Sequence, residues 1–414
     1  MNVYLHSLGC RLNQSEIQEL ARQFAAAGCA VVETPGEADV CVVNTCVVTA
    51  QAERKSRHVL SALHRQNPHA RVAAIGCYPT FAPERLAAAP EIAWSIPNAD
   101  KERTVALVTG GEPAPATAMR PAFRTRAFVK VQEGCENHCT YCIVRYLRGP
   151  ARSWPLDDVV ATVRAHVAAG YREVVLTGVN LGAYGRDLGH ARSLHELVAA
   201  LLERTEVARL RLSSLEPWDV EPDFFGLWED ARLCRHLHLP LQSGCDATLR
   251  RMGRRNTTAA YARLVAAARA AIPDLSLTTD VMVGFPGEDA PAFEESLAFV
   301  EQMDFARLHV FPYSLRPGTA AARLAGRVPW AVCQERAARM RALGARQAAA
   351  FAQRFVGREM TVLWERRRSN GRYHGLTDTY VTVVARHTDD LCNAITRTRL
   401  VAIRGDVLEG EVIE

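Results

Sequence analysis

The sequence predicts an α/β protein in three parts: an N-terminal domain with an open parallel sheet, a central partial (β/α)6 barrel, and a small antiparallel β-barrel at the C-terminus. Short apolar runs alternate with helical patterns, which is typical of parallel strands connected by helices. Six such units follow one another in the middle of the chain, fewer than the eight of a closed barrel. After about residue 355 the pattern changes to short strands separated by polar turns. We place the domains at 1–110, 123–354 and 355–414, with a linker at 111–122.

The N-terminal domain is predicted from four strands and two helices. The strands are expected at Val3–Leu8, Asp39–Asn44, Val72–Gly76 and Ile92–Ile96, and the helices at Gln14–Ala27 and Thr49–Gln66. The second helix is expected to end before Asn67-Pro68, since proline disfavours a helical residue in front of it. The glycine and proline residues of Gly110–Pro115 are typical of a linker.

The central domain is predicted from six strands, each followed by a segment that can form a helix. These strands are expected at Phe128–Gln132, Glu173–Thr177, Arg209–Ser213, Leu237–Leu241, Ser276–Val281 and Arg307–Phe311. Repeated βα units with right-handed crossovers form either a barrel or an open sheet, and a partial barrel that is open on one side fits six units.

A long helix rich in alanine and arginine is expected at Trp330–Phe355, beginning after Pro329. Beyond it, four short strands predict the C-terminal β-barrel. They are expected at Met360–Trp364, Tyr380–Val384, Arg399–Ile403 and Val412–Ile413.

The composition is that of a globular protein, with 48% hydrophobic and 23% charged residues among 414. No run approaches the roughly 20 apolar residues of a membrane helix, and the N-terminus lacks a basic region followed by an apolar one. We therefore expect a soluble, unexported, cytoplasmic protein without a membrane partner. The net charge of +5 permits an anionic partner. The basic residues are almost all arginines, which suit phosphates and bases, although a genomic bias explains this equally well.

The strongest local motif is Cys135-x3-Cys139-x2-Cys142, directly after the first barrel strand. Three thiolates can hold three irons of a [4Fe–4S] cube and leave the fourth iron open to another ligand. S-adenosylmethionine (SAM) chemistry requires such an open iron. The cofactors would perform the radical step, and the protein would orient them. The alternative is a zinc site formed by these three cysteines with His138.

A second triad is dispersed in the sequence. Cys10, Cys46 and Cys77 each follow a predicted strand of the N-terminal sheet. The carboxyl ends of parallel strands share one edge, where open sheets bind ligands, so these thiols predict a second three-cysteine cluster. The alternative is that they are small buried apolar residues, as free cysteines often are. The other six cysteines have no comparable spacing, and we assign them no function.

Polar segments follow several of the barrel strands, where barrels of this kind carry their active sites. We expect SAM to be bound there by Tyr141, Gly178, Asn180, Ser213, Glu216, Gln242 and Asp280. Glycines would permit close backbone approach, although each segment can equally be ordinary turn chemistry. No side chain is assigned as a catalytic acid, base or nucleophile.

Two arginine-rich stretches favour nucleic acid. One is the helix region 323–355, and the other is Arg366-Arg367-Arg368 in the β-barrel. A basic helix leading into a small barrel can follow a phosphate backbone, but a solvated arginine-rich face is the more common explanation of such runs.

The motifs together resemble the radical SAM methylthiotransferases over nearly the whole chain. They are Ser7–Asn13, Asn44-Thr45-Cys46, Gly76–Pro79, the triad Cys135/Cys139/Cys142, and Gly375–Tyr380, which is similar to the signature of the RNA-binding TRAM domain. The resemblance implies two [4Fe–4S] clusters, one on each triad. The cluster on Cys135, Cys139 and Cys142 would cleave SAM to a deoxyadenosyl radical, and the auxiliary cluster on Cys10, Cys46 and Cys77 would present the sulfur. A second SAM would supply the methyl group.

Within that family, Cys10-Arg11-Leu12-Asn13 and Asn44–Thr49 are most similar to the branch that acts on threonylcarbamoyladenosine beside the anticodon of tRNA. The resemblance thus implies the tRNA anticodon stem-loop as a partner, and an electron donor such as flavodoxin or ferredoxin. Val47-Val48 and Cys245 depart from that branch's usual residues. The alternatives are action on isopentenyladenosine in tRNA, on an aspartate of a ribosomal protein, or a non-enzymatic iron–sulfur or zinc RNA-binding protein.

Overall fold

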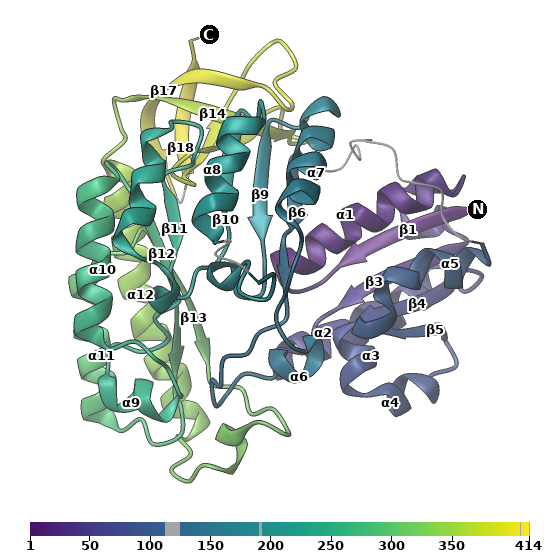
Figure 1. Ribbon diagram of the computed structural model, residues 1–414, viewed down its shortest axis with the longest axis horizontal. Coiled ribbons are helices and arrows are strands. Elements are labelled where there is room, and N and C mark those ends of the chain that lie inside the picture. Colours follow the sequence, from purple (N-terminus) through teal and green to yellow (C-terminus); the bar gives the residue numbers. More distant parts are fainter. Residues whose placement is uncertain (112–124, 190–192, 406, 414) are drawn as a thin grey trace.

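The computed structural model describes residues 1–111, 125–189, 193–405 and 407–413. Most of the predicted linker therefore lies outside the described residues. The N-terminal domain, the partial barrel and the C-terminal barrel pack against one another, and the C-terminal barrel covers one end of the partial barrel (Figure 1).

The N-terminal domain is an open, parallel, five-stranded sheet in the order β2-β1-β3-β4-β5. Its strands are β1 (Asn2–Ser7), β2 (Ala30–Val32), β3 (Val40–Thr45), β4 (Arg71–Gly76) and β5 (Ile92–Pro97). Helix α1 (Arg11–Ala26) packs on one face of the sheet with α5 (Thr104–Thr109), and α2 (Ala50–Gln66) packs on the other. The two faces are apolar because alternate residues of the buried strand β3 point to opposite sides.

The partial barrel contains six parallel strands in two groups, β10-β9-β6 and β11-β12-β13, which isolated bridges connect. The strands are β6 (Arg126–Lys130), β9 (Glu173–Thr177), β10 (Arg209–Leu212), β11 (His236–His238), β12 (Ser276–Val283) and β13 (Arg307–Pro312). The helices are α7 (Leu156–Ala168), α8 (Leu194–Arg204), α9 (Asp246–Arg251), α10 (Thr258–Ala271), α11 (Ala290–Met303) and α12 (Trp330–Gln353). This arrangement confirms the predicted fold class.

The first predicted barrel strand divides at Val131. Residues Gln132–Glu133 form β7, which pairs with β8 (Arg152–Ser153) as a separate antiparallel ribbon. The cysteine loop and the short helix α6 (Val144–Arg148) connect these two strands. The ribbon therefore holds both ends of the segment that carries Cys135, Cys139 and Cys142.

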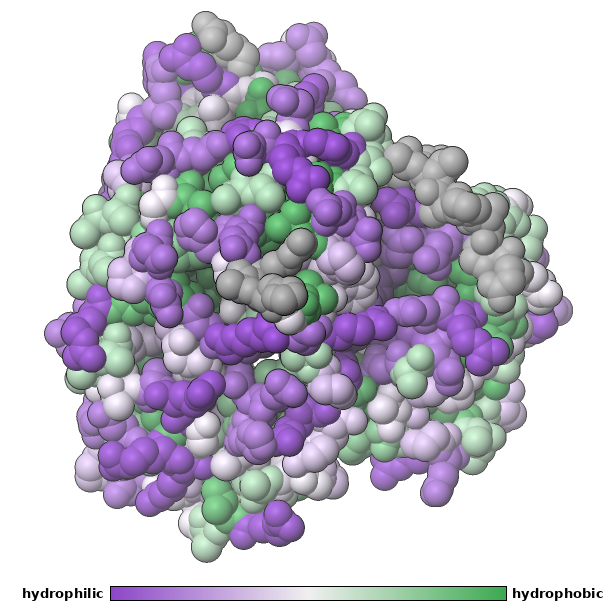
Figure 2. Space-filling view, in the orientation of Figure 1, coloured by the Kyte–Doolittle hydropathy of each residue, from purple (hydrophilic) through white to green (hydrophobic). Residues whose placement is uncertain are grey.

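The C-terminal part is a closed five-stranded barrel in the order β14-β15-β16-β18-β17. Its strands are β14 (Glu359–Arg367), β15 (Tyr373–Thr377), β16 (Thr382–Ala385), β17 (Ile395–Arg404) and β18 (Val407–Val412). All pairs are antiparallel except β16 with β18. Hydrophilic side chains cover much of this barrel on the face in Figure 2.

The C-terminal barrel is attached to the partial barrel by buried arginines. Arg209 and Arg211 of β10 donate hydrogen bonds to the backbone carbonyls of Thr361, Leu376, Thr377 and Asp378. Arg209 is the first residue of β10, and Figure 1 shows the C-terminal barrel at the end of the partial barrel opposite to the strands' carboxyl ends. Among the helices that the structure describes, none is long and apolar enough to cross a membrane.

Candidate functional site

The thiols Cys10, Cys46 and Cys77 lie at the carboxyl edge of the N-terminal sheet. Cys10 is the N-cap of α1 after β1, Cys46 directly follows β3, and Cys77 begins the short helix α3 (Cys77–Phe81) after β4. Strands β1, β3 and β4 are neighbours in the sheet, so the three cysteines share one edge. We call this group the auxiliary triad.

Polar residues of the same motifs fix the loops of the auxiliary triad. Asn13 donates from Nδ2 to the carbonyls of Leu8 (2.7 Å) and Thr45 (3.0 Å), which joins the loop after β1 to the end of β3. Thr45 Oγ1 donates to the carbonyl of Ile75 (2.7 Å) and accepts from the backbone N–H of Tyr78 (3.0 Å). These residues therefore hold the three loops in register with one another.

Gly9 allows the first loop to approach Cys46. Its φ is +89°, and a Cβ on Gly9 would lie 2.6 Å from Cβ and 2.7 Å from Sγ of Cys46. Such distances are closer than van der Waals contact, so no other residue fits here without displacing the thiol.

Burial raises the pKa of two thiols of the auxiliary triad, Cys10 and Cys46. For Cys46, burial raises the pKa to about 12. A hydrogen bond from the backbone of Val48 lowers this pKa, and the neighbouring thiols Cys10 and Cys77 raise it further. Because metal ligation requires thiolates, binding of a cluster would release these protons.

The second triad lies in the loop between β7 and α6, and we call it the loop triad. The loop is fixed from several sides: the backbone N–H of Cys135 donates to the carbonyl of Gly149 (3.2 Å), and that of Thr140 to the carbonyl of Met252 (2.9 Å). The carbonyl of Thr140 accepts from Ala321 (2.8 Å). Burial raises the pKa of Cys142 to about 12, and Cys139 and Cys135 raise it further, so the three thiols are near neighbours.

Arg254 is a residue of this site that the sequence analysis missed. Its guanidinium pairs with Glu216 (2.8 Å), donates a hydrogen bond to Cys139 and lies 4.4 Å from the ring centroid of Trp218. The side chain of Arg254 is 1% exposed. The only signal in the sequence is Gly253, whose positive φ of +67° ends the turn after α9 and brings the backbone close to the carbonyl of His138.

The residues predicted to bind SAM lie in the loop of the loop triad or on the strands of the partial barrel and the segments that follow them. Tyr141 lies in the loop itself, Gly178 and Asn180 follow β9, Ser213 and Glu216 follow β10, Gln242 follows β11, and Asp280 lies within β12. Gln132, which was not predicted, joins two of these segments: its Oε1 accepts from the backbone N–H of Asn180 (2.9 Å), and its Nε2 donates to the carbonyl of Gly134 (2.8 Å).

Three of these residues present buried polar atoms without a hydrogen-bond partner among the described residues. They are Asn180 Oδ1, Ser213 Oγ and Gln242 Oε1. Buried polar atoms are normally paired, so unpaired ones at one end of a barrel fit a polar ligand. Gln242 also has a φ of +73°, which is uncommon for a residue with a side chain.

Asp280 interacts with histidines of neighbouring strands. Its Oδ1 lies 3.4 Å from Nε2 of His238, whose ring contacts that of His309 at a centroid distance of 5.7 Å. Burial opposes ionisation of Asp280, but the hydrogen bond and charge of His238 lower its pKa overall.

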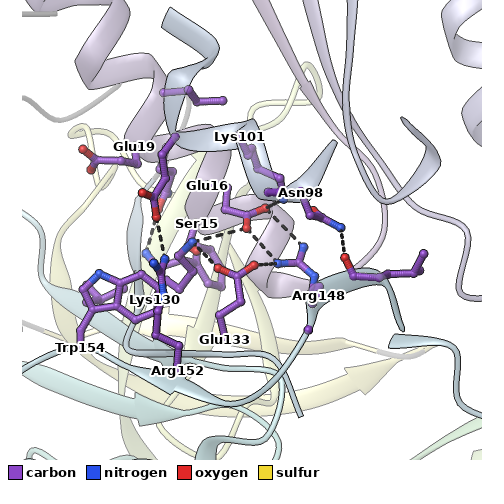
Figure 3. Close-up of a pocket in the computed structure, with 18 of the residues that line it drawn as sticks. Ser15, Glu16, Glu19, Asn98, Lys101, Lys130, Glu133, Arg148, Arg152 and Trp154 are labelled. Atoms are coloured by element: carbon purple, nitrogen blue, oxygen red, sulfur yellow. Dashed lines mark hydrogen bonds and ion pairs between the residues drawn. The ribbon is translucent and has the colours of Figure 1, made fainter. Parts of the chain in front are cut away.

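Helix α6 connects the two triads through Arg148. The Arg148 guanidinium donates to Asn13 Oδ1 (2.6 Å), Glu16 Oε1 (2.9 Å) and Glu133 Oε1 (2.5 Å), and Lys101 completes the network by donating to Glu16 (2.7 Å). Figure 3 shows Arg148 and Lys101 pointing toward Glu16. Ile143 and Leu147 pack in the same apolar core as Cys46 and Cys77, so the segment that directly follows the loop triad packs against the auxiliary triad.

A cleft of about 900 Å³ lies between α1 and the β6–β8 region, next to this network (Figure 3). Trp154 lies at its margin between Lys130 and Arg152, whose charged groups are 4.7 and 4.8 Å from its ring centroid. None of the six triad cysteines lines the cleft. It is therefore separate from the thiols and exposes the outer side of the network.

The donor set fits iron–sulfur cubes. Within the described ranges, no group of three or more His, Cys, Asp or Glu side chains is arranged around a single metal ion. In a [4Fe–4S] cube, three cysteine thiolates bind three different irons rather than one shared ion. Each triad offers three thiols at separate positions of the chain, and neither triad includes a fourth cysteine. The ligand roles of these cysteines remain predictions.

Family profiles match both parts of the site. The profile of "Uncharacterized protein family UPF0004" matches residues 2–96, and that of the "Radical SAM superfamily" matches residues 129–300. The first contains the auxiliary triad and the second the loop triad.

Curated relatives match along most of the chain. The chain is 33% identical to the threonylcarbamoyladenosine tRNA methylthiotransferase MtaB of Bacillus subtilis (strain 168), over 99% of this chain and 96% of the relative. It is 34% identical to the tRNA-2-methylthio-N(6)-dimethylallyladenosine synthase of Acetivibrio thermocellus, over 87% and 80% of the two chains.

A solved structure supports the fold. The radical S-adenosylmethionine methyltransferase TsrM from Kitasatospora setae is similar with a TM-score of 0.55 and 14% identity, over 76% of this chain and 73% of that chain. Because relatives at 33–34% identity match most or nearly all of the chain and the central domain matches the radical SAM profile, the chain belongs to the radical SAM tRNA methylthiotransferase family.

Proposed function

We propose that this protein methylthiolates C2 of N6-threonylcarbamoyladenosine beside the anticodon of tRNA. The observation that carries the proposal is the pair of three-thiol sites that α6 connects: α6 directly follows the loop triad and packs in the same apolar core as Cys46 and Cys77. In this proposal the loop triad holds a [4Fe–4S] cluster that binds SAM, and the auxiliary triad holds a second cluster. Several relatives that match most of the chain are named for this substrate, which supports it over dimethylallyladenosine.

When bound, the clusters and SAM supply the radical that activates the carbon–hydrogen bond and the sulfur and methyl groups that replace the hydrogen. The chain's own residues bind and orient. Asn180, Ser213 and Gln242 offer their unpaired atoms to the polar groups of SAM. Arg254 holds Glu216 and Cys139 in fixed positions. The electrons would come from a flavodoxin- or ferredoxin-type donor, and the reaction would take place in the cytoplasm.

Iron content tests the two sites. The proposal expects about eight irons per chain after anaerobic reconstitution and about four in either Cys139→Ala or Cys46→Ala. Cys139→Ala should abolish SAM cleavage, whereas Cys46→Ala should retain cleavage but form no methylthio product. Zinc without visible absorption, or methylthiolated RNA from Cys46→Ala, would contradict the proposal.

Mass spectrometry of tRNA nucleosides tests the substrate. Cells that lack this protein should lose 2-methylthio-N6-threonylcarbamoyladenosine and retain its precursor, N6-threonylcarbamoyladenosine. The second candidate is dimethylallyladenosine, which the relatives of that name favour. Loss of the methylthio derivative of dimethylallyladenosine instead would assign this chain to that substrate.

A further inference from the structure

Arg11, the residue after Cys10, reaches from the auxiliary triad to the amino end of the partial barrel, which the C-terminal barrel covers. Its guanidinium lies 5.4 Å from the ring centroid of Tyr380 and donates a long hydrogen bond of 3.4 Å to the Tyr380 hydroxyl. Tyr380 belongs to the C-terminal barrel, stacks on His236 of β11 and also accepts from Arg126 (2.9 Å). Arg11 is thus held at a meeting point of all three domains.

The charges at this point do not balance. Four guanidiniums, those of Arg11, Arg126, Arg209 and Arg211, face two carboxylates. Glu173 pairs with Arg211 at 2.7 Å and lies 3.9 Å from Arg126 and Arg209, and Glu365 pairs with Arg126 at 2.7 Å. Arg209 and Arg211 also donate to backbone carbonyls. In the described ranges, Arg11 has no carboxylate within ion-pair distance, and the Tyr380 hydroxyl is its only polar partner.

A half-buried guanidinium with one neutral partner is unfavourable unless an anion completes it. A guanidinium presents five N–H donors in a planar fork that matches a carboxylate in two places. Arg11 therefore has the vacant donors and the surplus charge that a ligand carboxylate needs, and it lies one residue from a cysteine of the auxiliary triad.

We propose that Arg11 binds the threonyl carboxylate of N6-threonylcarbamoyladenosine and so sets the preference of the enzyme for this nucleoside. This inference rests on the proposed function. In adenine, C2 and the N6 substituent flank N1, so a base that presents C2 to the auxiliary triad directs its N6 chain along the same edge. The neighbour of Cys10 is then in position to receive that chain. A dimethylallyl group has no charge for Arg11 to bind.

The test compares two RNA probes with the reconstituted full-length enzyme. One is an anticodon stem-loop that carries threonylcarbamoyladenosine, and the other carries its threonine methyl ester, which lacks the negative charge and adds one methyl group. For the wild type we expect the acid to be favoured about 10- to 100-fold in kcat/KM, from the strength of a charged hydrogen-bonded pair. The difference should lie mainly in KM. An equal kcat/KM for acid and ester would overturn the inference, and this comparison needs no variant.

Variants of Arg11 then assign the preference. Arg11→Gln should lower kcat/KM for the acid to the value for the ester, and Arg11→Lys should restore part of the preference. Tyr380→Phe, which removes the hydroxyl partner but keeps the ring, should retain it. If Arg11→Gln lowers acid and ester equally, Arg11 is a structural link between domains and the inference is wrong. If the wild type modifies only dimethylallyladenosine probes, the proposed function fails instead.

Discussion

At the scale of single residues, glycines decide whether the backbone can come close enough to a thiol. Gly9 and Gly170 have the same φ of +89°, but their surroundings differ. A Cβ at Gly9 would meet Cys46, whereas a Cβ at Gly170 would meet nothing within 4 Å. The pair therefore separates backbone strain from displacement of a cluster ligand.

We predict that Gly9→Ala loses the auxiliary cluster. Both Gly9→Ala and Gly170→Ala carry the cost of a positive φ, about 1 kcal/mol, but only the first pushes Cys46 away. Iron analysis after reconstitution should give about four irons per chain for Gly9→Ala and about eight for Gly170→Ala. Full iron content in Gly9→Ala would show that the loop after β1 does not hold a cluster ligand in place.

His166 predicts how stability depends on pH. It is buried in α7, and burial together with the charge of Arg22 lowers its pKa to about 4. The unfolded chain, with a pKa near 6.5, binds more protons than the folded chain between these values, so stability falls as the pH drops from 6.5 towards 4. The loss amounts to about 3 kcal/mol.

The pH prediction is checked by urea unfolding of the cluster-free chain at pH 7, 6 and 5. His166→Phe should reduce the loss of stability over this range, because phenylalanine fills the site with an aromatic ring that cannot be protonated. His69→Gln, at an exposed position, should leave the wild-type dependence unchanged. An equal slope in the wild type and His166→Phe would contradict the assignment.

At the scale of elements, the short helix α6 controls how the two triads are positioned. Arg148 at its end is 2% exposed in its side chain and forms ion pairs with Glu16 and Glu133. Arg145, on the same helix, forms no ion pair among the described residues and lies 5.3 Å from the ring centroid of Tyr146. Arg148 can therefore be tested against a neighbour of the same type.

We predict that Arg148→Met destabilises the protein by about 1–3 kcal/mol, because it removes the buried hydrogen bonds to Asn13, Glu16 and Glu133, whereas Lys101 and Lys130 still pair with the two carboxylates. Arg145→Met should cost less than about 0.5 kcal/mol. The measurement is chemical unfolding of both variants. Methylthio product should decrease more than SAM cleavage in Arg148→Met, since the two clusters would lose their common support. Similar stability of the two variants would contradict this role of α6.

The elements that the sequence predicted are those with strong apolar periodicity. Helix α2 and strand β9 match the prediction to within a residue. The sequence did not predict β2 or β15, because Ala30–Val32 is only three residues long and Tyr373–Thr377 is interrupted by Gly375. The strand predicted to begin at Tyr380 starts at Thr382, since Tyr380 has a φ of +66° that a strand does not accommodate.

In the candidate site, spacing revealed the cysteines but not their supports. Cys135, Cys139 and Cys142 lie within eight residues of the sequence, and Cys10, Cys46 and Cys77 each follow a predicted strand. Arg254 and Arg148 could not be found in this way, because their partners Glu216 and Glu16 are distant in the sequence and meet them only through the tertiary fold.

At the scale of the whole molecule, the arginines of α12 and those of the C-terminal barrel differ in availability. On α12, Arg336, Arg339 and Arg346 pair with Glu288, Glu294 and Glu301. The sequence suggested a basic helix because these acids belong to another segment. Arg366, Arg367 and Arg368 are exposed and form no ion pair among the residues that the structure describes. Among the described residues, the C-terminal barrel therefore carries a run of three exposed arginines without ion pairs, whereas α12 carries one such arginine, Arg341.

We predict that replacing Arg366, Arg367 and Arg368 with Gln weakens tRNA binding in a salt-dependent manner. Each phosphate contact contributes about 0.7–0.9 to the slope of log affinity against log salt, so the slope should decrease by about two. Filter binding or fluorescence anisotropy of the reconstituted enzyme from low to moderate salt gives the slope. Arg339→Gln with Arg346→Gln is the matched control, because both side chains already face carboxylates, and its slope should equal that of the wild type. The opposite result would be a smaller salt slope in the α12 control and a wild-type salt slope in the triple variant. In that case the phosphates would be bound along α12, and the C-terminal barrel would serve mainly to close the amino end of the partial barrel.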